Sequence, residues 1–169
     1  MRLRELHIIN FKNHTDTELR FGEDVVCFSG ANGCGKTNLL DAIYYLSFCK
    51  SYFNAIDSQN IMHNEPFMMI QGDFGTEEAE DVVHCGVKRN QKKVFKRNQK
   101  EYEKLADHIG LFPSVIVTPT DTTLITEGSE ERRKFIDSII SQLDKSYLEI
   151  LIAYNKVLSH RNALLKNLA

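Results

Sequence analysis

A glycine-rich octapeptide constrains this chain more than any other feature. Residues 30–37 read Gly-Ala-Asn-Gly-Cys-Gly-Lys-Thr and match the pattern GxxxxGK[ST]. The continuous apolar run Val25–Phe28 precedes them, and from Lys36 onward apolar residues recur every three to four positions as far as Leu46. These patterns predict a short buried strand, a glycine loop and a helix in direct succession. This is the context in which the octapeptide forms a phosphate-binding loop.

Each position of such a loop has a chemical role. Glycines allow a tight turn, so that backbone amides converge on phosphate oxygens at the positive end of the helix dipole. The predicted nucleotide-binding residues are Gly30, Ala31, Asn32, Gly33, Cys34, Gly35, Lys36 and Thr37. Lys36 would reach the β- and γ-phosphates of ATP, and the Thr37 hydroxyl would ligate Mg²⁺. Cys34 is either a redox-sensitive thiol or a small side chain that points away from the nucleotide.

The loop does not specify a reaction, because kinases, GTPases, helicases and transporter-like ATPases share it. With 21 basic and 23 acidic residues the net charge is only −2, so any DNA binding must come from local patches. The four cysteines and six histidines have no metal-ligand spacing. No apolar stretch approaches the roughly 20 residues of a membrane helix, and the N-terminus lacks signal-peptide features, so we expect a cytoplasmic protein.

Most of the remaining chain predicts strands, followed by two helices. Apolar alternation or short apolar runs indicate strands at 3–11, 67–70, 82–87, 94–95 and 114–117, with a weaker one at 16–21. Polar turns between them favour an antiparallel meander over a second βαβ unit. Ser129 is the expected N-cap of a helix over 130–143. A second helix should follow, with a heptad-like stripe at Ile150, Tyr154, Val157, Arg161, Leu164 and Leu168.

The densest basic run lies at residues 88–100, KRNQKKVFKRNQK, with seven lysines and arginines. Its candidates for contacts with DNA phosphates are Lys88, Arg89, Lys92, Lys93, Lys96 and Arg97. The run is expected to span a hairpin, which would divide its charges between two strands. In that arrangement the charges could instead protect an exposed sheet edge.

Four blocks of the sequence together resemble the RecF family of bacterial DNA repair ATPases, which is related to the SMC proteins. The blocks are LRELHIINFKNH, GANGCGKTNLLDAIYYLSFCKSY, VIVTPTDTTLITEGSEERRKFID and YLEILIAYNKVLSHRNALLK. The resemblance implies an α/β fold: a P-loop NTPase lobe of the ABC/SMC-like head type, with an antiparallel β subdomain, over residues 1–143. Residues 144–169 would begin a helical arm.

The resemblance also implies a function. Family members bind gapped or single-stranded DNA in an ATP-dependent manner, with RecR as partner, in replication, recombinational repair and the SOS response, and they act as ATP-sandwiched homodimers. Lys12 and Asn13 would approach the nucleotide, although a solvated turn is the alternative. Where the family has Pro-Glu-Asp, this sequence has Pro119-Thr120-Asp121. Asp121 could orient a metal-bound water or cap a turn.

The motifs that complete the family's ATPase site are missing from this sequence. The signature motif, the Walker B carboxylates and the switch histidine lie in the C-terminal half of RecF proteins. We find no LSxGQ-like segment and no apolar strand that ends in an acidic pair. The chain is therefore expected to be a fragment that binds nucleotide weakly and is inactive alone. The alternatives are the head of another SMC-like ATPase and a small P-loop kinase.

Overall fold

The computed structural model of this protein describes residues 2–75, 79–122, 124 and 128–166. The chain forms two compact units, one of residues 1–108 with 114–116 and the other of residues 109–113 with 117–169. Both predicted C-terminal helices belong to the second unit. The domain boundary at residue 143 stays a prediction.

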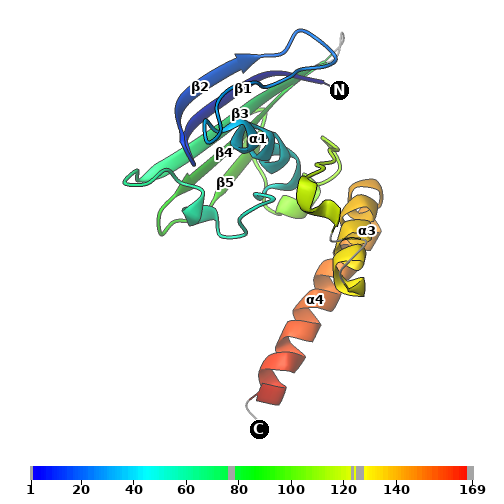
Figure 1. The fold of residues 1–169 in the computed structure, drawn as a ribbon. Coiled ribbons are helices and arrows are strands. Elements are labelled where there is room, and N and C mark those ends of the chain that lie inside the picture. The colour runs from blue at the N-terminus through cyan, green and yellow to red at the C-terminus, as the bar shows by residue number, and fades with distance from the viewer. Residues whose placement is uncertain (1, 76–78, 123, 125–127, 167–169) are drawn as a thin grey trace. The chain divides into compact units, whose positions relative to one another are not determined.

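The first unit is built on an antiparallel sheet (Figure 1). Its strands in the described part of the chain are β1 (Arg2–Phe11), β2 (His14–Arg20), β3 (Phe67–Gly75), β4 (Glu80–Lys88), β5 (Val94–Arg97) and β6 (Lys100–Glu101). Their order is β2-β1-β3-β4-β5-β6, and every neighbouring pair is antiparallel. The predicted antiparallel meander is therefore confirmed, and β1 joins it to the N-terminal hairpin. The short strand β6 was not predicted.

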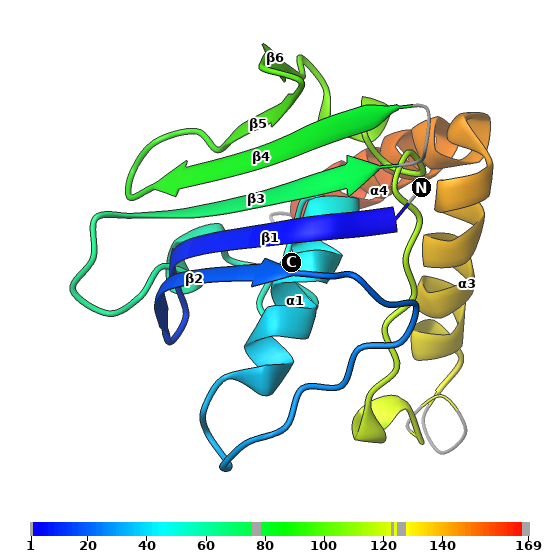
Figure 2. The same ribbon diagram turned by 90° about the horizontal axis from the view of Figure 1, so that it is seen from above.

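Helix α1 (Lys36–Phe48) lies across one face of this sheet (Figure 2). Because side chains alternate along a strand, Ile8, Ile70 and Cys85 stand side by side on the covered face, and all three are fully buried. Gly72 lies in the same layer. A Cβ atom there would lie 2.4 Å from Leu46 Cδ1, so glycine lets the helix approach the sheet closely.

His108 holds the C-terminal end of α1 in the first unit. Its imidazole is fully buried, with Nε2 2.6 Å from the Leu46 carbonyl oxygen and Nδ1 3.1 Å from the Tyr102 hydroxyl. A carbonyl can only accept, so Nε2 donates and Nδ1 accepts from tyrosine. This bond satisfies one of the carbonyls that the last turn of a helix leaves without a partner. Burial lowers the pKa of His108, and the charge of Arg97 lowers it further.

We expect the free energy of unfolding to fall as the pH falls below about 6.5, the ordinary pKa of histidine. The unfolded chain binds a proton at His108 there, whereas the folded protein resists protonation, so acid favours unfolding. One such group contributes a slope of at most about 1.4 kcal/mol per pH unit. Urea unfolding of wild type and His108→Gln at pH 5.5 to 7.5 measures it, because glutamine does not titrate. If the free energy of unfolding changed with pH in the same way in both proteins, His108 would not be the group responsible.

The second unit contains α3 (Ser129–Leu143) and α4 (Lys145–Lys166). Asp144 joins them: its amide donates to the Ile140 carbonyl, and its carboxylate accepts from the amide of Tyr147. Both helices are confirmed, but Ser129 is not the N-cap. Gly128 occupies that position, and the Ser129 hydroxyl instead accepts a bond from Arg133.

The α4 stripe is exposed where it is described. Ile150, Tyr154, Val157 and Leu164 are each at least 60% exposed, and Leu168 lies outside the described residues. None of the described helices combines the length and apolar character needed to cross a bilayer.

Two predicted strands are not strands in this structure. Val25–Phe28 and Ser114–Val117 are irregular, with Val25 86% and Val117 80% exposed. An apolar run becomes a buried strand only where neighbouring strands bond to its backbone. No described strand pairs with either segment. The local composition favoured a strand at both places and the prediction was wrong, because the described residues do not contribute the partner on which a strand depends.

Candidate phosphate-binding site

The loop at residues 30–35 has the backbone that its glycines predict. Gly30, Gly33 and Gly35 have φ angles of 150°, 83° and 103°, in a region that other residues adopt only with strain. Residues 30–34 are exposed, and α1 begins directly afterwards at Lys36. The predicted succession of glycine loop and helix is therefore present at the surface of the first unit.

The amides of this loop are open to an anion. Only a long bond of 3.4 Å, from the Cys34 amide to the Ala31 carbonyl, closes the turn. The amides of Gly33, Gly35, Lys36 and Thr37 donate to none of the described residues. They lie where the helix dipole is positive, so a phosphate would meet unpaired donors and a favourable field.

Lys36 folds back over the loop that precedes it. Its ammonium donates to the carbonyls of Gly30 and Ala31, both at 2.8 Å, and lies 3.9 Å from Cys34 Sγ. The positive charge is thus held beside the unpaired amides. Thr37 is exposed, and its hydroxyl has no hydrogen-bond partner among the described residues, so it is available to a cation. Both interpretations of the exposed Cys34 stay open.

The turn between β1 and β2 contacts both the loop and α1. Lys12 is occupied within the chain: its ammonium lies 2.5 Å from Oδ2 of Asp41, a fully buried residue of α1. Asp41 also accepts from the Ser51 hydroxyl at 2.6 Å and the Tyr52 amide at 2.7 Å. Contact of Lys12 with a nucleotide stays a prediction, and the structure gives this side chain a partner of its own.

Asn13 and its neighbour reach the phosphate loop itself. Asn13 Nδ2 donates to the Gly33 carbonyl at 3.2 Å, and His14 Nε2 lies 3.1 Å from the Gly35 carbonyl oxygen. His14 was not among the residues predicted to approach the nucleotide. It is 21 residues from Gly35, and nothing in its local sequence marks the contact.

The basic run is divided among several local structures. Three of its side chains are engaged within the chain. Arg97 binds Asp81 through two bonds of 2.8 Å, which hold the pKa of that carboxyl below its ordinary value. Lys93 forms a 2.8 Å ion pair with Asp57, and Arg89 donates to the carbonyls of Glu65 and Ser58.

The other three candidates for DNA contact have no described partner and are at least partly exposed to solvent. Lys88 and Lys92 are exposed, and Lys96 is partly exposed on β5. Contact with DNA stays a prediction for all six positions, and Lys88, Lys92 and Lys96 could meet phosphates without giving up a described partner.

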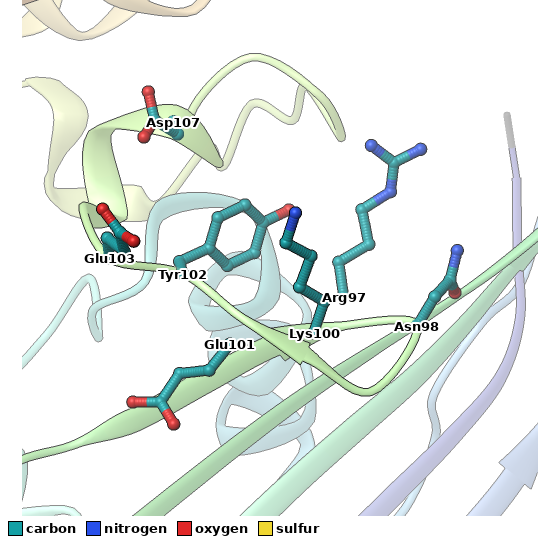
Figure 3. Close-up of a pocket in the computed structure, with 7 residues that line it drawn as sticks. All are labelled: Arg97, Asn98, Lys100, Glu101, Tyr102, Glu103 and Asp107. Carbon is teal, nitrogen blue, oxygen red and sulfur yellow. The ribbon is translucent and has the colours of Figure 1, made fainter.

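A cavity of about 580 Å³ lies beside the β5–β6 hairpin (Figure 3). Its lining residues are Arg97, Asn98, Lys100, Glu101, Tyr102, Glu103 and Asp107. Arg97 and Lys100 are paired in register and project to one side of the hairpin, while Glu101 projects to the other. Because acidic and basic groups are mixed here and Arg97 is bound to Asp81, this cavity lacks the single sign of charge that a phosphate site needs.

Asp121 behaves as a turn cap. Its carboxylate accepts from the Thr118 amide at 2.6 Å and from the Thr118 hydroxyl at 3.0 Å, at the start of the 3-10 turn Pro119–Thr122. This matches the capping alternative. Among the described residues, no group of three or more His, Cys, Asp or Glu side chains is placed to hold a metal ion.

Comparison with known proteins identifies relatives along nearly the whole chain. A family model described as an AAA domain matches residues 5–167. A protein of Phocaeicola vulgatus, "DNA replication and repair protein RecF", is 57% identical over 168 residues, which is 99% of this chain and 45% of that protein. The protein of the same name from Bacteroides thetaiotaomicron is 54% identical over 99% of this chain and 46% of its own length. The chain thus spans about half the length of these curated relatives.

Solved structures agree with this result. The structure of the recombination mediator protein RecF with ATP, in the RecFOR pathway, has a TM-score of 0.90 and 36% identity over 98% of this chain and 45% of that chain. An SMC ATPase structure with 20% identity and a TM-score of 0.67, over 82% of this chain and 99% of that chain, shares the fold. The fold class expected from the sequence is confirmed.

Proposed function

Because this chain belongs to the AAA-domain family and is similar to RecF proteins over almost all of its residues, we propose that it binds ATP with Mg²⁺ as part of a DNA replication and repair ATPase. One observation carries the proposal. Unpaired amides at the N-terminus of α1 and the Lys36 ammonium converge on one exposed loop. That donor set suits a polyphosphate.

Different residues of the loop would bind different parts of Mg-ATP. The amides of Gly33, Gly35 and Lys36 would bind phosphate oxygens, and the Lys36 ammonium would reach the outer phosphates. Thr37 would hold Mg²⁺ through its hydroxyl, which has no described protein partner. Bound Mg²⁺ neutralises phosphate charge, while the chain's own contribution is to orient the donors.

The role of the whole protein follows from its relatives. We infer ATP-dependent binding to gapped or single-stranded DNA, RecR as partner, an ATP-sandwiched homodimer and a cytoplasmic site of action. Two observations support this: more than 50% sequence identity to proteins named for DNA replication and repair, and structural similarity to a RecF protein whose structure is described as part of the RecFOR pathway. An SMC-type head is less favoured, because the SMC ATPase structure shares only 20% identity.

Lys36→Ala tests the site directly. Hydrogen bonds to a charged group contribute about 1.5–3 kcal/mol, so its loss should weaken Mg-ATP binding between roughly 10-fold and 150-fold. Thermal unfolding with and without Mg-ATP measures this. A tenfold excess over Kd stabilises the folded wild type by about 1.4 kcal/mol, and the same concentration should stabilise the variant by at most about 0.4 kcal/mol.

The matched control is Lys50→Ala, which removes an exposed lysine just beyond α1. It should keep the wild-type response. If the wild type shows no shift at millimolar Mg-ATP, or if both variants respond like the wild type, the proposed nucleotide site is wrong.

A further inference from the structure

The β1–β2 turn (Lys12 and Asn13, taken together with His14, the first residue of β2) forms hydrogen bonds with the phosphate loop that, among the described residues, are all made to carbonyl oxygens. Asn13 binds the Gly33 carbonyl and His14 binds the Gly35 carbonyl. The fit is tight, because a Cβ atom on Gly35 would lie 2.5 Å from His14 Nε2 and 2.6 Å from Asn13 Oδ1. The turn therefore holds one side of the loop and leaves the other side to the ligand.

Holding a carbonyl also sets the direction of an amide. In a planar trans peptide the C=O of one residue and the N–H of the next point in opposite directions. The Gly35 carbonyl accepts from His14 and also from the Leu39 amide of α1, both at 3.1 Å, and the His14 donor favours a Lys36 amide that points away from the turn. The bond to the Gly33 carbonyl likewise fixes the peptide plane of the Cys34 amide, which donates to the Ala31 carbonyl. The Lys36 amide is one of the donors left unpaired for the phosphates.

The two side chains of the turn are themselves oriented. A carbonyl only accepts, so His14 Nε2 must carry the proton. His14 Nδ1 lies 3.2 Å from Thr17 Oγ1, which donates to it. Thr17 is held in β2 opposite Ile8. Asn38 of α1 donates to Asn13 Oδ1 at 2.8 Å, which turns the Asn13 amide nitrogen toward Gly33.

We propose that the β1–β2 turn is a positioning clamp for nucleotide binding: His14, oriented by Thr17, and Asn13, oriented by Asn38, hold the carbonyls of Gly35 and Gly33 so that the Lys36 amide faces the phosphates. The inference rests on the proposed ATP site. His14 and Asn13 are positioning residues, because they act on the ligand through the peptide planes of Gly33 and Gly35. The Lys12–Asp41 ion pair fastens the same turn to α1.

His14→Leu removes the donor at similar size and should raise the Kd for Mg-ATP between about twofold and tenfold, the range for one neutral hydrogen bond. His14→Gln keeps an N–H donor and should recover most of the affinity. Thr17→Val removes the group that selects the tautomer and should fall between wild type and His14→Leu. Isothermal titration with Mg-ATP measures the three constants, with His63→Leu, an exposed histidine, as the matched control.

A second readout separates positioning from simple support of the fold. Nitrogen-15 NMR without nucleotide should identify His14 as the Nε2–H tautomer, and the Lys36 amide resonance should move in His14→Leu but not in His63→Leu. A structural role alone would lower the free energy of unfolding while Kd and the Lys36 amide stayed unchanged, and that result would overturn the clamp. If His14→Leu does not fold, Thr17→Val decides: weaker binding supports the clamp, and unchanged binding refutes it.

The failure of the clamp and the failure of the ATP site give different results. If the wild type does not bind Mg-ATP, both the ATP site and the clamp are refuted. If Lys36→Ala abolishes binding and His14→Leu leaves it unchanged, only the clamp is refuted.

Discussion

Replacing Asp41 by alanine is expected to lower the free energy of unfolding by about 3–5 kcal/mol, the usual effect of removing one partner of a buried ion pair. The carboxylate is fully buried and accepts from Lys12, Ser51 and Tyr52. Without it, an ammonium, a hydroxyl and a backbone amide lose their acceptor. The lost energy is a large part of the roughly 5–15 kcal/mol that holds a typical domain folded. Equilibrium urea unfolding measures the change.

Asp24→Ala is the control for the Asp41 result. Asp24 also pairs with a basic residue, Arg2, at 2.9 Å, but its side chain is 91% exposed. An exposed pair contributes at most about 1 kcal/mol. Equal losses in the two variants would contradict the view that burial makes the Asp41 cluster important. Asp41→Asn, which keeps the shape and loses the charge, should fall between wild type and Asp41→Ala.

Gly110→Ala is expected to destabilise the second unit by about 2–5 kcal/mol, from backbone strain and overpacking together. Gly110 has a φ of 90°, where an alanine is strained. Its Cβ would lie 2.4 Å from the carbonyl oxygen of Gln142, in the last turn of α3. Because the clashing atom belongs to the backbone, the clash can be avoided only if the C-terminal end of α3 moves. Urea unfolding followed by circular dichroism detects the loss.

Gly22→Ala is the matched glycine substitution. No atom lies within 4 Å of a Cβ at Gly22, and its φ is outside the strained region. Alanine there should be neutral or stabilise the protein by up to about 1 kcal/mol, because it restricts the unfolded chain. A Gly110→Ala variant as stable as Gly22→Ala would show that the 109–113 segment does not pack against α3 as described.

The sequence could predict the candidate site only where the interacting residues lie close together in the chain. The octapeptide contains the residues that shape it, because its glycines supply the positive φ angles and Lys36 folds back on Gly30 and Ala31, six and five residues earlier. The partners of Lys12 and His14 are 29 and 21 residues away, so their contacts arise only when α1 packs beside the first hairpin. The sequence predicts that a hairpin divides the basic run, but it does not reveal that Asp57 and Asp81 engage two of its members.

The sequence by itself determined the elements whose stability is local: the glycine loop, α1, α3, α4 and the alternating strands of the antiparallel sheet. Periodicity is sufficient there, because the spacing of apolar residues along the chain distinguishes a helix from a strand without reference to any distant partner. Tertiary structure decided which segments pair. Val25–Phe28 and Ser114–Val117 have strand composition but remain irregular in the described structure, because a strand needs hydrogen bonds from another segment and no local pattern specifies that partner.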